Sequence, residues 1–352
     1  MRGKKPYQIL WLICTLALAG LATGVRLWQE STVFEGDFGL PVRGATASVA
    51  MVCVLVMAAA VLCILAARQP IVRPPRAQVR GRRWAMSFFA TGDLVFLALM
   101  WFSAFSALAA VPMLFGQGRA LWKAYQVALA MKTWQGGDNG VLSMVTAVLA
   151  LLAFFGLLQI GRDGYHPGRR SRGGFWAALP ACAGCGWLLN TYRNCAADPV
   201  LWDYVPLLLA VIAGMLMYTD WAGMSCAAAR PRRTLWLAGM TVVCSWVALA
   251  SSPDTGPAML LISQSAAALA ALWRLPINLQ NPPKVGWEGN LDTCSIQDAE
   301  PQVEPQDQQP PLTQPEPQPR VEEDWTWSRE ESQAMNCTGE NKIGRASCRE
   351  RV

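Results

Sequence analysis

Residues Thr46 to Ala67 read TASVAMVCVLVMAAAVLCILAA, an apolar run without a charged residue. A helix rises about 1.5 Å per residue, so about 20 such residues cross the hydrocarbon core of a bilayer, which is about 30 Å thick. A helix also satisfies its own backbone hydrogen bonds where no water is present. The stretch therefore predicts a membrane-spanning helix.

Seven other stretches have the same character, in a chain that is 53% hydrophobic and 15% charged. The fifth to eighth are shorter and richer in Ala and Gly, which makes their ends harder to place. We predict an all-α integral membrane protein, a bundle of about eight transmembrane helices within residues 1–274. The expected spans are Tyr7 to Val25, Thr46 to Ala67, Phe88 to Phe115, Val141 to Ile160, Phe175 to Tyr192, Trp202 to Tyr218, Leu235 to Ser251 and Ala258 to Trp273.

The basic residues in the loops predict the orientation, because Lys and Arg in short loops are retained on the cytoplasmic side. With the N-terminus inside, seventeen of them lie in inner segments, mainly in Arg68 to Arg83, Arg162 to Arg172 and Arg230 to Arg233. The outer loops hold six: Arg26, Arg43, Arg119, Lys123, Lys132 and Arg193. We expect both termini inside, a location in a bacterial cytoplasmic membrane, and contact between the inner Arg clusters and anionic lipid headgroups.

Two segments allow alternative interpretations. The first span is either an uncleaved helix or a signal peptide, because Arg2, Lys4 and Lys5 precede an apolar run that holds small residues. Ala120 to Trp134 is either an amphipathic helix in the outer interface or a helical extension of the third span.

Residues 275–341 are rich in Pro, Gln and Glu, as in EPQVEPQDQQPPLTQPEPQP from Glu300 to Pro319. They hold too few apolar groups to offset chain entropy, so we expect a disordered, acidic cytoplasmic tail. Within it, Trp325 and Trp327 are either a docking peptide for a protein partner or two incidental tryptophans. The last residues, Lys342 to Val352 (KIGRASCRERV), resemble a translated sequencing adapter, and we treat them as an artefact.

The chain contains a single histidine, His166, in a predicted inner loop. Bis-histidine haem, an intramembrane His metal site and a Ser–His dyad would each need imidazole at membrane depth. No phosphate-binding loop of the Gly-x-x-x-x-Gly-Lys-Ser/Thr type is present either. We therefore expect no cofactor, no metal, no catalytic residue and no nucleic-acid partner.

Three polar residues are the candidates for a cavity at mid-depth: Asp93, Asn190 and Gln264. An acid inside a span usually marks an ion or proton pathway. Leu94 to Phe115 is long enough to span alone, however, which would leave Asp93 at the inner interface beside Arg82 and Arg83.

Cys182 and Cys185 are spaced as in dithiol redox centres, one helical turn apart on the fifth span. A membrane thiol oxidoreductase also needs a second dithiol or a quinone site, and no second pair with this spacing occurs. The alternative interpretation is that both thiols pack as small apolar groups.

The segment from Tyr192 to Tyr204 is polar and aromatic for a short outer loop. It forms either an ordinary solvated connection held by ion pairs or an external polar pocket, together with Arg26, Trp28, Glu30, Glu35 and Asp37.

Three short motifs, TYRN (Thr191 to Asn194), DPVLWDY (Asp198 to Tyr204) and RPRR (Arg230 to Arg233), resemble segments of uncharacterised polytopic proteins of Gram-positive anaerobic bacteria. The resemblance covers Thr191 to Leu275. It implies a membrane fold and brings no activity, ligand or catalytic residue.

Together these features favour a non-catalytic membrane protein, either a transporter-like bundle or a membrane scaffold or sensor. The transporter hypothesis requires a polar cavity, whereas the scaffold hypothesis needs only the outer loops and the tail. A thiol–disulfide redox protein that uses Cys182 and Cys185 is the alternative.

Overall fold

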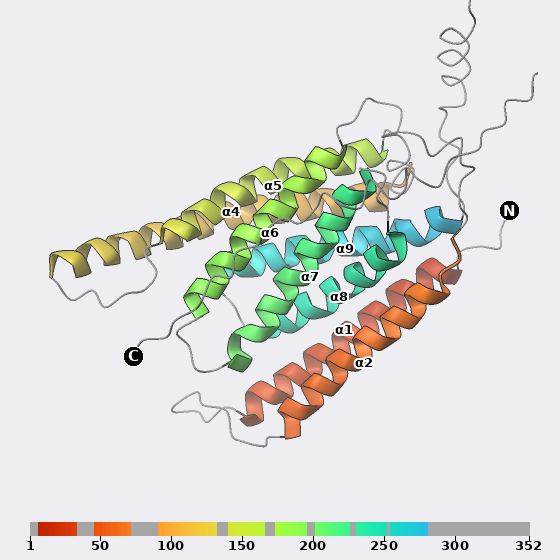
Figure 1. The fold of residues 1–352 in the computed structure, drawn as a ribbon, viewed down its shortest axis with the longest axis horizontal. Coiled ribbons are helices and arrows are strands. Elements are labelled where there is room, and N and C mark those ends of the chain that lie inside the picture. The colour runs from red at the N-terminus through yellow and green to blue at the C-terminus, as the bar shows by residue number, and fades with distance from the viewer. Residues whose placement is uncertain are drawn as a thin grey trace, which may run out of the picture. The chain divides into compact units, whose positions relative to one another are not determined.

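The computed structural model describes residues 6–33, 46–71, 91–131, 140–165, 173–195, 201–225, 230–251 and 254–280. All regular structure in these residues is α-helical, and Figure 1 shows the helices packed side by side in one compact unit. The helices are α1 (Pro6–Val33), α2 (Thr46–Arg68), α4 (Leu94–Ala130), α5 (Val141–Tyr165), α6 (Gly173–Cys195), α7 (Leu201–Ser225), α8 (Pro231–Ala250) and α9 (Thr255–Gln280).

Seven of these eight helices are long and apolar enough to cross a membrane, which confirms the prediction of an all-helical, multi-pass membrane protein. The exception is α6, where Pro180, Asn190 and several glycines interrupt the apolar residues.

Small residues face the inside of the bundle and large apolar residues face outward, as α5 illustrates. Its buried face includes Ala147, Ala150 and Ala153, which recur at the spacing of one helical face. Val148 and Phe155 on the opposite face are about half exposed. A soluble protein rarely exposes such a continuous apolar surface, whereas close packing of small residues with apolar groups toward lipid is usual in membranes.

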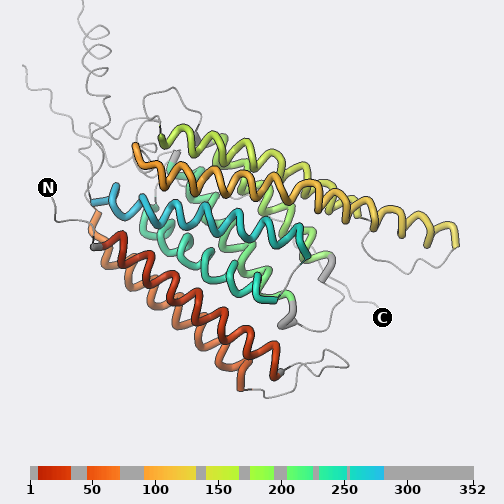
Figure 2. The backbone as a smooth tube through the Cα atoms, turned by 180° about the vertical axis from the view of Figure 1, so that it is seen from behind, coloured from red at the N-terminus to blue at the C-terminus, as the bar shows by residue number. Residues whose placement is uncertain are grey.

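The two most central helices are α8 and α9, with 67% and 61% of their most apolar windows buried. In both Figure 1 and Figure 2 they lie between α4 on one side and the α1–α2 hairpin on the other. Helices α4, α5, α6, α7 and α9 contact one another in that order, and α9 also contacts α4, so these five form a closed ring.

Helix α6 runs antiparallel to α5 along its length. Near the start of α5, the Ser143 hydroxyl donates to Oδ1 of Asn190 at 3.2 Å. Near the other end, a Cβ placed on Gly156 would lie 2.6 Å from the backbone oxygen of Trp176. Since α5 is one of the seven apolar helices, α6 occupies the same depth in the bundle.

Most of the described helices extend beyond the predicted spans; α7, for example, continues past Tyr218 to Ser225. Helix α1 continues beyond Val25 and includes Arg26. Helix α4 continues without a break to Ala130, which confirms the helical-extension interpretation of this segment over a separate interfacial helix. Helix α9 continues to Gln280, past the predicted span end at Trp273 and past Leu275, where the disordered tail was predicted to begin. The prediction was wrong for 275–280, because Leu275 and Leu279 recur on one buried face.

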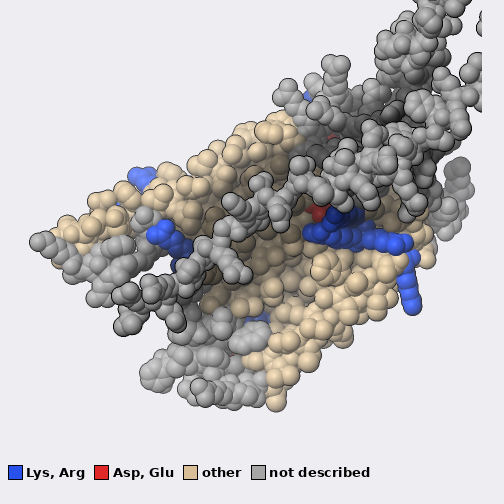
Figure 3. Space-filling view, viewed as in Figure 1, with Lys and Arg blue, Asp and Glu red and all other residues tan. Residues whose placement is uncertain are grey.

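Basic side chains gather at opposite ends of the face shown in Figure 3, with mostly uncharged surface between them. At one end lie Arg68 of α2, Arg162 of α5 and the arginines at the start of α8; at the other lie Arg119 and Lys123 of α4. This is the distribution expected of a protein with an apolar belt.

Several predictions concern residues outside the described part of the chain. These are the tail with Trp325 and Trp327, the segment Lys342 to Val352, His166, and the loop arginines from Arg73 to Arg83 and from Arg169 to Arg172.

Candidate functional site

A small cavity lies inside the ring of five helices. Its volume is about 40 Å³, and every helix of the ring contributes to its wall. Most of the wall is formed by Ala, Gly, Leu and Met side chains. The polar or aromatic lining residues are Thr146 of α5, Trp187 of α6, Tyr218 of α7, and Ser263 and Gln264 of α9.

Gln264 is the most polar side chain in this wall and is 5% exposed. Its Nε2 donates to the Ser245 hydroxyl of α8 at 2.9 Å and to the Ala210 carbonyl oxygen of α7 at 3.2 Å. The amide thereby ties three helices together. Its Oε1 lies where a Cβ on Gly214 would sit, so only glycine at that position leaves room for this rotamer.

Serine side chains form hydrogen bonds between α4 and the opposite side of α9. The Ser103 hydroxyl donates to the Ser263 carbonyl oxygen at 2.7 Å, and the Ser263 hydroxyl donates to the Ser103 carbonyl oxygen at 2.7 Å. One turn away, the Ser106 hydroxyl donates to the Met259 carbonyl oxygen at 2.8 Å. Small side chains with reciprocal hydrogen bonds let the two backbones approach closely in an apolar environment.

The cavity offers hydrogen-bonding groups without charge. Among the described residues, none that lines it is Asp, Glu, Lys, Arg or His. A cavity needs roughly 10–15 Å³ to hold one water molecule, so 40 Å³ admits a few water molecules and no larger solute. In this conformation the ring surrounds a small, mostly apolar space that a few uncharged hydrogen-bonding groups line.

The structure places the predicted mid-depth residues apart. Asp93 is the N-cap of α4, where its Oδ1 accepts from the Val95 backbone N–H at 3.2 Å. Its Oδ2 accepts from Nε1 of Trp273 at 2.8 Å. A carboxylate at a helix N-terminus interacts favourably with the free backbone N–H groups and the helix dipole. Asp93 therefore caps a helix and does not line the cavity.

Asn190 is buried between α5 and α6 and accepts the hydrogen bond from Ser143. It lies nearer the end of the ring than the cavity and is not among the cavity-lining residues. Gln264 is thus the one predicted polar candidate that the fold brings to the cavity.

Cys182 and Cys185 are free thiols on exposed positions of α6. Sγ of Cys185 lies 3.3 Å from Sδ of Met215 on α7. Both thiols flank Ala183 and Gly184, which face the cavity, so the cysteines point away from it.

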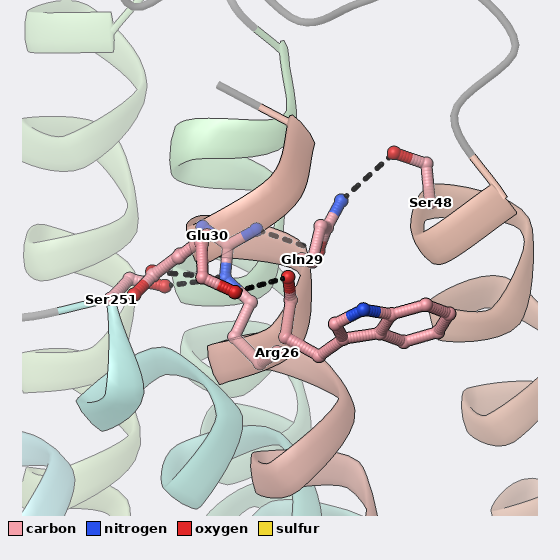
Figure 4. A network of polar contacts seen from close by, with 7 residues as sticks. Arg26, Gln29, Glu30, Ser48 and Ser251 are labelled. Carbon is pink, nitrogen blue, oxygen red and sulfur yellow. Dashed lines mark hydrogen bonds and ion pairs between the residues drawn. The ribbon is translucent and has the colours of Figure 1, made fainter. Parts of the chain in front are cut away.

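Arg26, which the sequence analysis placed in an outer loop, is instead a fully buried residue of α1. Its Nε donates to the Ser251 hydroxyl at 2.9 Å, and its Nη1 donates to Oε1 of Gln29 at 2.9 Å. Nε also lies 3.3 Å from Oε1 of Glu30. Figure 4 shows this cluster, with Gln29 reaching across to Ser48 on α2.

A sequence signal for this cluster does exist. Arg26, Gln29 and Glu30 are spaced so that the three side chains fall on one side of a helix. A hydropathy scale ends the first span before Arg26, because it assigns each residue the free-energy cost of burying its charge. It does not include the hydrogen-bonding partners that offset this cost.

Among the described residues, no three His, Cys, Asp or Glu side chains group together where a metal ion would bind. No protein-family model matches the chain, and no curated protein or solved structure matches it. The resemblance to polytopic proteins of Gram-positive anaerobes stays a prediction.

Proposed function

We propose that the chain is a transporter-like, non-catalytic protein of a bacterial cytoplasmic membrane, with eight spans and both termini inside. The ring of α4, α5, α6, α7 and α9 would enclose the solute pathway, and the α1–α2 hairpin would support it from outside.

The position of α6 supports an eighth span. It packs between α5 and α7, both of which are apolar enough to cross a membrane, and it follows α5 from Asn190 to Trp176. Its lower hydropathy has a physical reason, because Pro180, Gly184 and Trp187 face the cavity and not lipid. A helix that lines a polar space tolerates residues that a lipid-facing helix does not.

The single observation that carries the proposal is the placement of Gln264. An amide within an apolar helix is costly unless it is hydrogen-bonded. The Gln264 amide bonds Ser245 and Ala210, and the same side chain borders a cavity shared by five helices. Because the described part of the wall has hydrogen-bonding groups and no charged side chain, we infer a small, uncharged polar solute as the substrate class. Entry of such a solute requires the helices to separate from the closed arrangement.

Water access to the ring tests this proposal. Ala150 lines the cavity and is 1% exposed, whereas Leu152 on the same helix is 41% exposed on the outer surface of the bundle. We would introduce Ala150→Cys and, as the matched control, Leu152→Cys in a background without native cysteines. Both would be treated in proteoliposomes with a membrane-impermeant methanethiosulfonate reagent.

A thiol reacts as the thiolate, which forms in water and not in lipid. We expect the cysteine at 150 to react faster than the cysteine at 152, because the ring opens to water during its cycle. Reaction at 150 no faster than at 152 would identify the ring as a dry packing core and contradict the proposal.

Two other hypotheses stay as predictions. A scaffold or sensor role would rest on the outer loops and on a protein partner bound through Trp325 and Trp327. A thiol redox role would rest on Cys182 and Cys185. Contact between the inner Arg clusters and anionic lipid headgroups is compatible with all three.

A further inference from the structure

A groove of about 420 Å³ lies between α4 and α5, separate from the cavity inside the ring. It is lined by Leu97 and Trp101 of α4 and by Leu158, Gln159, Arg162 and Tyr165 of α5. Its volume falls in the range of small-molecule sites, roughly 300–1,000 Å³.

Beside the groove, α4 and α5 approach closely at Gly161. A Cβ at this position would lie 3.0 Å from Cβ of Met100 and 3.6 Å from Cδ1 of Trp101. The missing side chain lets α4 and α5 approach here and leaves the larger Trp101 and Leu158 to form the walls.

The groove has one charged end. Arg162 lies in the last turn of α5, and its side chain is exposed. It is the only charged lining residue in the part of the chain that the structure describes. Gln159 and Tyr165 add polar groups at the same end, so an anionic oxygen would meet a guanidinium together with neutral hydrogen-bonding groups.

Away from Arg162 the groove continues into a strip of exposed apolar side chains on α4 and α5. Trp101 is 47% exposed, and Phe105 and Phe155 further along the two helices are about half exposed. The Phe105 ring packs against Phe154 with centroids 5.9 Å apart. A ligand that follows this strip needs a long apolar chain attached to an anionic headgroup.

We propose that the groove is a specific site for one anionic phospholipid, with the headgroup phosphate on Arg162 and an acyl chain along Trp101 and Leu158. The inference rests on the proposed membrane location and adds a defined lipid site to it. The acyl chain would lie beside the bundle, in the leaflet next to the end of α5.

Lipid retention by the purified full-length protein tests this site. The protein in detergent would be mixed with equal amounts of phosphatidylglycerol and phosphatidylcholine, and bound lipids counted by native mass spectrometry. We expect the wild-type protein to retain one phosphatidylglycerol molecule in preference to phosphatidylcholine. Arg162→Gln should reduce the preference about fivefold, which corresponds to roughly 1 kcal/mol, the worth of one arginine near an anionic surface.

Arg68→Gln is the matched control, because Arg68 is an exposed arginine in the last turn of α2 and does not line the groove. It should leave the preference unchanged. Trp101→Ala should weaken the retention of both lipids, because it shortens the apolar wall. Excess inorganic phosphate should not displace the lipid, since the acyl chain supplies part of the affinity.

Equal losses in the two arginine variants, or no loss in Arg162→Gln, would overturn the proposal. Thermal unfolding of each variant would show that the fold is retained, which is expected because both arginines are exposed. This experiment does not depend on the labelling of the cysteine at position 150. If that cysteine reacts as expected but the protein shows no preference for phosphatidylglycerol, the lipid site is rejected and the proposed function is not.

Discussion

The Nε of Arg26 donates a hydrogen bond to the Ser251 hydroxyl at 2.9 Å, and this bond joins α1 to the residue that ends α8. The two residues lie 225 positions apart in the chain. A buried guanidinium needs several partners to offset its lost hydration, and Gln29 and Glu30 supply the others. The arginine thus fixes the α1–α2 hairpin against a central helix of the bundle.

Arg26→Ala should destabilise the protein strongly. Breaking a buried charge cluster by removing one partner costs about 3–5 kcal/mol, and the lower part of that range applies because Glu30 is 31% exposed. The measurement is the thermal midpoint of the detergent-purified protein. Lys123→Ala removes an exposed cation from α4 and should leave the midpoint almost unchanged. Equal effects of the two substitutions would show that Arg26 does not organise the hairpin.

Gly156→Ala should disrupt the contact between α5 and α6. The added methyl group would meet the backbone oxygen of Trp176 at 2.6 Å and Cδ of Pro180 at 3.0 Å, and neither can move without shifting α6. Overpacking of this kind costs about 1–3 kcal/mol.

Gly20→Ala is the control for this substitution, because nothing lies within 4 Å of a Cβ at position 20 of α1. It should be neutral or slightly stabilising, since Ala favours a helix by up to about 1 kcal/mol over Gly. Thermal unfolding of both variants checks the pair. A Gly156→Ala protein as stable as the Gly20→Ala protein would contradict the close packing of α6 on α5.

Cys182 and Cys185 should stay reduced in cells under mild oxidant, because both thiols lie on the exposed face of α6, which points to lipid in the proposed arrangement and is out of reach of water-soluble disulfides. Alkylation with a mass-tagged maleimide after denaturation would count the reduced thiols, with Cys182→Ser as the reference for one missing tag. A reversible loss of two tags together in the wild type, absent in the Cys182→Ser variant, would instead favour the redox hypothesis.

The apolar runs carried most of the information about the fold, because a span requires a length and a composition that sequence displays directly. The starts of α2 and α5 agree with prediction at Thr46 and Val141. The end of α9 was placed too early, since Leu275 and Leu279 are buried by neighbouring helices that hydropathy does not consider.

The candidate site was predicted only in part. Gln264 was identified because an amide in an apolar run is unusual, and the fold does bring it to a cavity. Asp93 was ambiguous, and the structure resolves it as a helix cap. The role of Arg26 depends on Ser251 and Ser48, which are distant in sequence, and no local pattern pairs them.

If α6 crosses the membrane as the eighth span and forms a wall of the ring, its two ends lie on opposite sides of the membrane. We would place single cysteines at Phe175 and Arg193, exposed residues near opposite ends of α6, in a cysteine-free background. The reagent would be a membrane-impermeant maleimide added to intact cells and then to permeabilised cells. We expect labelling of Arg193→Cys in intact cells and of Phe175→Cys only after permeabilisation. Labelling of both cysteines from the same side would show that α6 does not span the membrane, and the eight-span topology would be wrong.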